Sequence, residues 1–140
     1  MKWYTLWLAV VCVVVFLLQL IFPGITEDFL LRSSDVIARP WILITSVFLH
    51  GSISHLVFNM FALIVFGLLL EGEIGSRRFL IIFFLTGIVA SIVSSIFYNA
   101  SLGASGAIFG VIGTLAILRP MMTVWAFGVP MPMIIAATAW

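Results

Sequence analysis

Two short segments hold most of the side chains in this sequence that could do chemistry. The segment HGSISHLVFN contains His50, His55 and Asn59, and the last two are four residues apart, so they share one face of a helix. The segment GASGAIFG contains Ser105 between small neighbours. Together the two segments offer imidazole and amide donors and one hydroxyl that could act as a nucleophile.

The residues that other protease chemistries need are absent from these two segments or lie elsewhere in the sequence. A zinc protease of the HExxH type needs a glutamate between two close histidines, and none lies between His50 and His55. An aspartyl intramembrane protease needs two buried acids, but Asp28 and Asp35 lie in a segment with several charges. The single cysteine, Cys12, excludes an internal disulfide and a cysteine-based zinc site. What remains is serine chemistry with amide and imidazole donors.

The glycines around Ser105 have two interpretations. A serine at the start of a helix lies where free backbone N–H groups and the helix dipole favour a developing oxyanion, and Gly103 and Gly106 would let a substrate strand approach the backbone. Gly106 and Gly110 also form a GxxxG pair, which is typical of close helix packing. We expect the serines of the preceding segment only to bond a carbonyl one turn back: Ser91, Ser94 and Ser95.

The composition requires lipid around most of the chain. Of the 140 residues, 64% are hydrophobic and 8% are charged, whereas about a quarter are charged in a soluble domain. The net charge of +1 offers no basic surface for nucleic acid. The fold class that this predicts is an all-α membrane protein, a polytopic helical bundle in one domain over residues 1–140.

Hydropathy divides the chain into spans of about 20 apolar residues. The predicted spans cover 3–22, 55–70, 79–98 and 104–118, and a fifth starts near 129–133 and contains the last residue, Trp140. The first run is too long for a signal peptide and lacks a cleavage site, so we expect it to remain as a helix. The predicted loops cover 25–39 and 71–78, residues 40–54 lie at the interface, and 99–103 form a tight turn.

Charge asymmetry predicts a cytoplasmic N-terminus. This orientation places four cations inside: Lys2, Arg77, Arg78 and Arg119. Arg32 and Arg39 then lie outside, next to three acids. Because the second and fourth spans both descend from the outer side, His55, Asn59 and Ser105 fall in the same, extracytoplasmic leaflet.

In this order the motifs resemble those of the rhomboid family of intramembrane serine proteases. GASG is similar to the family's GxSG nucleophile motif, and HGSISHLVFN to its H-x4-H-x3-N pattern. EGEIGSRRF resembles its E-x3-G-x2-RF stretch, and Trp41 its loop tryptophan. The matching positions outside GASG are Trp41, His50, His55, Asn59, Glu71, Gly75, Arg78 and Phe79.

The resemblance implies a bundle of six core helices with a water-filled cavity open to the extracytoplasmic side. It implies Ser105 as the nucleophile, with His55, Asn59 and the Ser105 backbone N–H as oxyanion donors. His50 would be structural. Glu71 and Arg78 are also read as structural, bonding loop backbone at the membrane edge. Substrates would be single-span membrane proteins cut in or near the bilayer, with no metal or cofactor.

Two positions depart from the family pattern. Ile42 follows the loop tryptophan where the family often has arginine. The family's general base is a histidine on the sixth helix, but this sequence has no histidine after Asn59. We therefore expect an N-terminal portion with about five of the six spans, inactive without the missing histidine. We also expect the face of Gly106, Gly110 and Gly113 to require a tightly packed neighbour, the family's sixth helix.

Two alternatives keep the membrane fold but change the function. A non-catalytic rhomboid-like protein would bind membrane helices, and it could lack the base as this chain does. A small transporter or channel subunit would need polar groups along a path to both sides of the membrane. The polar cluster here falls in one leaflet, which disfavours the transporter.

Overall fold

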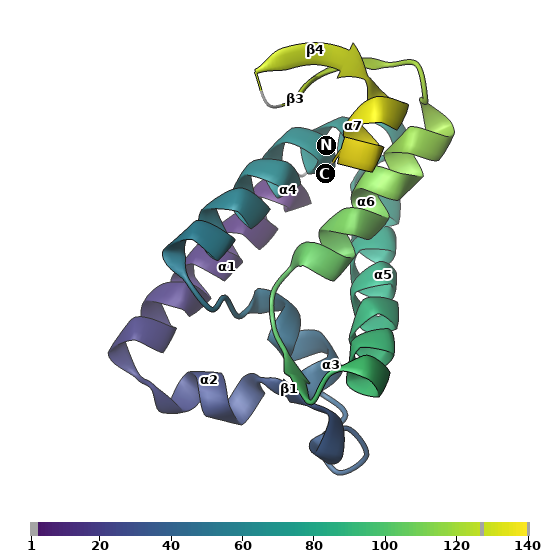
Figure 1. The fold of residues 1–140 in the computed structure, drawn as a ribbon. Helices are drawn as coiled ribbons and strands as arrows, with labels where there is room; N and C mark the ends of the chain where they lie inside the picture. Colours follow the sequence, from purple (N-terminus) through teal and green to yellow (C-terminus); the bar gives the residue numbers. More distant parts are fainter. Residues whose placement is uncertain (1–2, 127, 140) are drawn as a thin grey trace.

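The computed structural model describes residues 3–126 and 128–139, and this part of the chain is mostly helical (Figure 1). Lys2, which counts toward the charge asymmetry, and Trp140 lie outside the described residues. The long helices are α1 (Tyr4–Ile21), α4 (Ile53–Ile74), α5 (Ser76–Phe97) and α6 (Ser105–Leu118). Short helices and strands connect them: α2 (Gly24–Phe29), β1 (Leu31–Arg32), η1 (Ser33–Asp35), α3 (Ile42–Thr45), η2 (Ser46–Phe48), β2 (Ala100–Ser101), β3 (Thr123–Ala126), β4 (Val129–Pro132) and α7 (Met133–Ala139).

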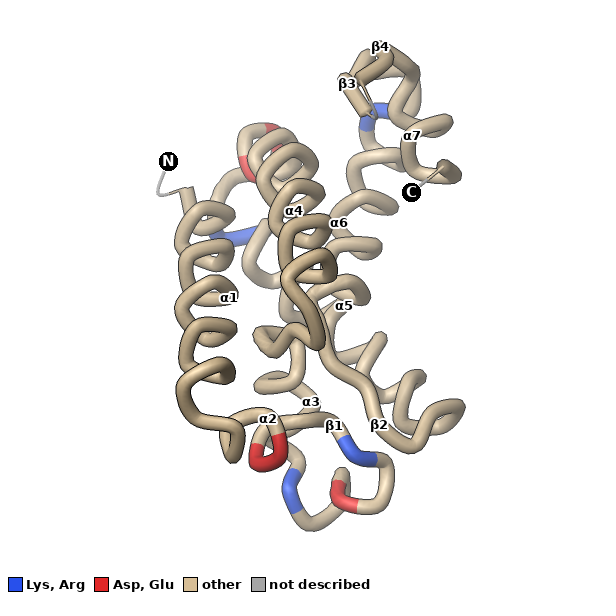
Figure 2. The backbone as a smooth tube through the Cα atoms, turned by 60° about the vertical axis from the view of Figure 1, so that its left-hand side comes forward, with Lys and Arg blue, Asp and Glu red and all other residues tan. Residues whose placement is uncertain are grey.

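Three of the described helices, α1, α4 and α5, are long and apolar enough to cross a membrane. Helix α6 is apolar but has only 14 residues. Figure 2 shows that the charged residues gather at the two ends of the bundle, while the helices between carry almost none. This separation is what a bilayer around the middle of the bundle requires.

The predicted loop over 71–78 is wrong, because helix continues through most of it. Helix α4 runs to Ile74, α5 begins at Ser76, and Gly75 alone joins them. The N–H of Gly75 still donates to the Glu71 carbonyl at 2.9 Å, and its φ of 86° turns the chain. The charged residues of this region therefore lie on helix ends that extend beyond the apolar part.

The predicted tight turn over 99–103 contains a short strand instead. β2 pairs antiparallel with β1, with Leu31 opposite Ser101 and Arg32 opposite Ala100. The segment before α6 is thereby tied to the connection between α1 and α4. Within the predicted interfacial segment 40–54, α3 and η2 form two short helical turns that end just before the site.

The predicted fifth span begins with a β-hairpin. β3 and β4 pair antiparallel, and both Pro130 and Pro132 lie in β4. Helix α7 follows with seven residues, and the N–H of Met133 donates to the Met122 carbonyl at 2.8 Å. The helix is thus packed against the end of α6, and the count of five spans stays a prediction.

Helix α6 packs closely on α5, and glycines make this possible. A side chain at Gly106 would overlap Ala90, and one at Gly110 would overlap Thr86. The packing interpretation of this glycine pair is therefore confirmed, but the neighbour is α5 and not a sixth helix. At Gly113 an added Cβ would meet no atom of the described chain within 4 Å, so this glycine is not part of the contact.

Candidate active site

His55 and Asn59 lie on one face of α4, as their spacing predicts. The helix begins after Ser52, whose Oγ accepts the His55 backbone N–H at 3.1 Å and so caps the first turn. The His55 side chain is half-buried, and Asn59 is 6% exposed. Both side chains therefore lie near the start of a long membrane helix, largely removed from solvent.

Gly103 lies directly against these two side chains. A Cβ at Gly103 would be 2.6 Å from His55 Cε1, 2.8 Å from His55 Nε2 and 3.8 Å from Asn59 Nδ2. Its φ of 115° is in the region that favours glycine, and its N–H donates to the Ser46 carbonyl at 2.9 Å. Both the space and the backbone conformation thus require glycine at this position.

Ser105 is the first residue of α6, two positions after Gly103. It is half-buried, and its backbone N–H belongs to the first turn, where N–H groups have no intrahelical acceptor. Because Gly103 touches His55, the turn into α6 brings Ser105 to the same region as the imidazole and the amide. The site thus combines a hydroxyl, a helix N-terminus and two side-chain donors.

Two buried polar atoms of this region have no hydrogen-bond partner within the described residues: His50 Nε2 and Asn59 Nδ2. A buried donor without an acceptor costs about 1–3 kcal/mol, and native structures contain few of them. The unpaired amide of Asn59 is close to Gly103. It is therefore available to an acceptor that enters the site.

His50 lies behind His55, before α4 begins. Its ring and that of His55 meet edge to face, with centroids 5.2 Å apart, and its Nδ1 is 3.3 Å from the Phe48 carbonyl. Burial, and then the neighbouring His55, lowers the pKa of His50 to about 4. His50 is therefore neutral at physiological pH, which suits a packing role.

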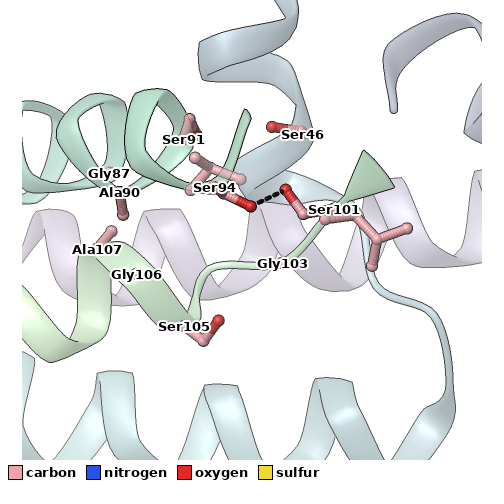
Figure 3. Close-up of a pocket in the computed structure, with 12 residues that line it drawn as sticks. Ser46, Gly87, Ala90, Ser91, Ser94, Ser101, Gly103, Ser105, Gly106 and Ala107 are labelled. Carbon is pink, nitrogen blue, oxygen red and sulfur yellow. Dashed lines mark hydrogen bonds between the residues drawn. The ribbon is translucent and has the colours of Figure 1, made fainter. Parts of the chain in front are cut away.

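A pocket of about 130 Å³ opens beside Ser105, between α5 and the turn into α6 (Figure 3). Four hydroxyl side chains line it in addition to Ser105: Ser46, Ser91, Ser94 and Ser101. Ser94 donates to Ser101 Oγ at 2.7 Å, so it does not bond a carbonyl as predicted, whereas Ser95 donates to the Ile92 carbonyl at 2.7 Å. The lining is polar enough to hold water.

Glu71 and Arg78 lie at the other end of the bundle. Glu71 is fully buried on α4 and accepts hydrogen bonds from the N–H groups of Tyr4 and Thr5 and from Thr5 Oγ1, at 2.7–2.9 Å. Its carboxylate thus caps the first turn of α1, and the predicted contact with loop backbone is wrong because no loop is there. Arg78 is exposed on the first turn of α5.

The predicted loop tryptophan, Trp41, is half exposed at the start of α3. The next residue, Ile42, is completely buried, so the position where the family often has arginine is part of the core. A cation is nevertheless close, because the guanidinium carbon of Arg39 is 5.9 Å from the indole centroid.

Sequence reasoning missed two residues that support the site. The Ser46 carbonyl holds Gly103, and the Gln19 side chain of α1 contacts the His50 backbone. A signal for Gln19 was present, because it is the one side-chain amide in the apolar run 3–22, and polar groups in membrane helices are functional candidates. Nothing in the sequence marks the Ser46 carbonyl.

The helices and the site define a polytopic membrane protein with a serine at a helix N-terminus. The family model described as "Rhomboid domain" matches residues 38–140, and the chain therefore belongs to the rhomboid family. With three apolar helices, it is an integral membrane protein.

Similar proteins come from plants, bacteria and an apicomplexan. "RHOMBOID-like protein 6, mitochondrial" of Arabidopsis thaliana is 44% identical over 87 residues, 61% of this chain and 28% of the relative. "Rhomboid protease GluP" of Bacillus subtilis is 49% identical over 76 residues, 54% and 15% respectively. "Rhomboid-like protease 3" of Toxoplasma gondii is 40% identical over 78 residues, 54% and 30% respectively. The matched parts thus span less than a third of each of these relatives, two of which are named as proteases.

Proposed function

We propose that the protein is an intramembrane serine endopeptidase of the rhomboid type. Ser105 is the nucleophile, and His55, Asn59 and the Ser105 backbone N–H are the oxyanion donors, with Gly103 and Gly106 leaving room for the substrate backbone. The observation that carries the proposal is the buried Asn59 amide, unpaired within the described residues, next to a glycine that lies against His55 Nε2. Packing alone gives no reason to leave this donor unpaired.

The chemistry that these groups support is acyl transfer to serine. Ser105 Oγ attacks the scissile carbonyl carbon and loses its proton to a base, while the carbonyl oxygen takes the negative charge. Donors aimed at that oxygen stabilise the transition state more than the ground state. The base passes its proton to the leaving amine, and water then hydrolyses the acyl-enzyme.

The base is the histidine that the family has on its sixth helix. Neither of the two histidines in this sequence suits the role: His55 is an oxyanion donor in this proposal, and His50 packs behind it. A serine hydroxyl without a base is a weak nucleophile at neutral pH. We therefore propose that residues 1–140 alone do not turn over peptide substrates.

The substrates in this proposal are single-span membrane proteins, cut in or near the bilayer. The N-terminus is cytoplasmic and the site opens to the extracytoplasmic side. Charge supports this orientation, because Arg77 and Arg78 at the start of α5 and Arg119 just after α6 lie at one end of the bundle. Helix α2 and β1 lie at the other end (Figure 1), where the segment 25–39 has two arginines and three acids.

The test uses the longer protein that this proposal implies, residues 1–140 together with the sixth helix that carries the base, which is called the full-length protein below. In liposomes it should cleave a fluorogenic membrane peptide. Ser105→Ala should abolish turnover while the thermal unfolding midpoint stays within a few degrees of the parent. His55→Ala and Asn59→Ala should each lower kcat by on the order of 10²–10³. Turnover by Ser105→Ala equal to that of the parent would exclude Ser105 as the nucleophile.

A serine-reactive fluorophosphonate separates this proposal from a non-catalytic helix-binding protein. The full-length parent should be labelled at Ser105, and Ser105→Ala should not be labelled. A folded full-length protein that binds membrane helices but resists labelling at every pH tested would favour the non-catalytic alternative.

A further inference from the structure

The side chain of Gln19 makes buried contacts that have no role in the proposed reaction. It lies on α1, is 9% exposed, and is the one side-chain amide in that apolar helix. Its Oε1 accepts the His50 backbone N–H at 3.0 Å, and its Nε2 donates to the His50 carbonyl at 3.2 Å. Nε2 also donates to Thr26 Oγ1 at 2.9 Å, at the first turns of α2. One side chain thus pairs both backbone polar groups of His50.

The backbone at His50 needs such a partner. Residues 49–52 connect η2 to α4. Within the described residues, neither the N–H nor the carbonyl of His50 forms a backbone–backbone hydrogen bond. His50 is 2% exposed, so water does not replace those bonds. Buried backbone groups are almost always paired, and Gln19 supplies both pairs from a different helix.

A chain of contacts leads from His50 to the nucleophile loop. The His50 ring packs edge to face on the His55 ring. His55 Nε2 in turn lies against Gly103, two residues before Ser105. A shift of the His50 backbone therefore moves the surface on which the His55 ring rests.

We propose that Gln19 is a positioning residue of the oxyanion site, which fixes His50 and, through the His50 ring, sets the orientation of His55. Its effect on catalysis rests on the proposed function, but its effect on the two imidazoles does not. Helix α1 is then part of the site's support, although it supplies no group that touches the substrate.

The test uses the fact that this chain has two histidines, His50 and His55. With ¹⁵N-histidine labelling of the 140-residue chain in detergent, only these two imidazoles give ring signals, and His50→Gln assigns them. Gln19→Leu removes both hydrogen bonds to His50 and the one to Thr26 at similar volume. Gln19→Asn withdraws the amide by one methylene group. Both variants should shift or broaden the ring signals of both histidines.

Thr5→Val is the matched control. It removes a buried hydrogen bond from the other end of α1, where Thr5 bonds Glu71, and should leave both imidazole signals in place. Unchanged His55 signals in both folded Gln19 variants would overturn the proposal, as would equal shifts in Thr5→Val. If Gln19→Leu does not fold, Gln19→Asn alone decides.

Activity of the full-length protein is the second readout. A misplacement of about 1 Å can cost on the order of 10² in rate, so Gln19→Leu should lower kcat at least tenfold and change KM little. Gln19→Glu, which in its neutral form can still accept from and donate to His50, should recover most of kcat. A kcat for Gln19→Leu equal to that of Thr5→Val would reduce Gln19 to a structural role. Shifted imidazoles without any protease activity in the parent would instead count against the proposed function.

Discussion

Gly103→Ala tests the arrangement of the site more directly than removal of a functional group. The new methyl would lie 2.6 Å from His55 Cε1 and 2.8 Å from His55 Nε2, whereas carbon atoms in contact are about 3.5–4.0 Å apart. The imidazole must therefore retreat by about 1 Å. The backbone at φ 115° adds strain of about 1–2 kcal/mol for a residue with a Cβ.

The displacement acts on catalysis, and the strain acts on stability. We expect kcat of the full-length protein to fall on the order of 10²-fold, because a donor misplaced by about 1 Å no longer meets the oxyanion. The free energy of unfolding should fall by about 1–3 kcal/mol. The assays are hydrolysis of a fluorogenic membrane peptide and denaturant unfolding in the same detergent.

Gly75→Ala separates the two effects. Gly75 also has a positive φ, 86°, but an added Cβ there would meet no atom of the described chain within 4 Å. It should lose similar stability and keep kcat within about threefold of the parent, since its backbone strain acts far from His55. Parental kcat in Gly103→Ala would refute the proposal that the His55 imidazole next to this glycine is an oxyanion donor.

Three further predictions concern stability and use denaturant unfolding in detergent. Glu71→Ala should lower the free energy of unfolding by about 3 kcal/mol, because three hydrogen bonds from the start of α1, two of them buried, lose their acceptor. A loss below about 1 kcal/mol would contradict this cap. Gly110→Ala should lower the free energy of unfolding by about 1–3 kcal/mol, because its methyl would overlap Thr86. Gly113→Ala should leave the free energy of unfolding unchanged or raise it by up to about 1 kcal/mol. Equal effects of the two substitutions would refute the α5–α6 contact. Stability should fall as pH is lowered from about 6.5 toward 4. In the unfolded chain His50 binds a proton over this range, whereas in the folded protein, where its pKa is lowered to about 4, it binds one only at the end of the range. His50→Gln should flatten this pH dependence, and an unchanged slope would assign the pH dependence to other groups.

The sequence predicted the helices and the grouping of site residues well, because both follow from strong local signals. Long apolar runs identify α1, α4 and α5 to within about four residues at each end. The four-residue spacing puts His55 and Asn59 on one face, and the start of α6 at Ser105 agrees with the glycine-rich segment before it. Span order alone then brought α4 and α6 together.

Helix ends were harder to predict where charge was the signal. Charged residues at 71–78 indicated a loop, yet only Gly75 interrupts the helix. Charge marks where the chain leaves the lipid, and a helix continues into water wherever its backbone hydrogen bonds can. The break at Gly75 depends instead on one glycine with positive φ, a signal that the charged neighbours concealed.

Contacts between helices were the other feature that the sequence did not predict. A small-residue face indicates close packing but not which helix packs there, and Gly106 and Gly110 meet α5, not the expected sixth helix. In the same way, the lone amide Gln19 gives no hint from its neighbours that its partner is His50, 31 residues away. Such pairings arise from the three-dimensional arrangement, and they require coordinates.

The distinction between packing and function at Asn59 depends on the same kind of information. The residue type and spacing identify a possible donor, but a satisfied asparagine that joins two helices would have the same sequence signal. The difference is the state of its amide, which is buried, lies near Gly103 and is unpaired within the described residues. Leaving such a donor without an acceptor lowers stability. Because the donor lies beside a position where only glycine fits, we favour the interpretation that the site is kept open for a substrate oxygen.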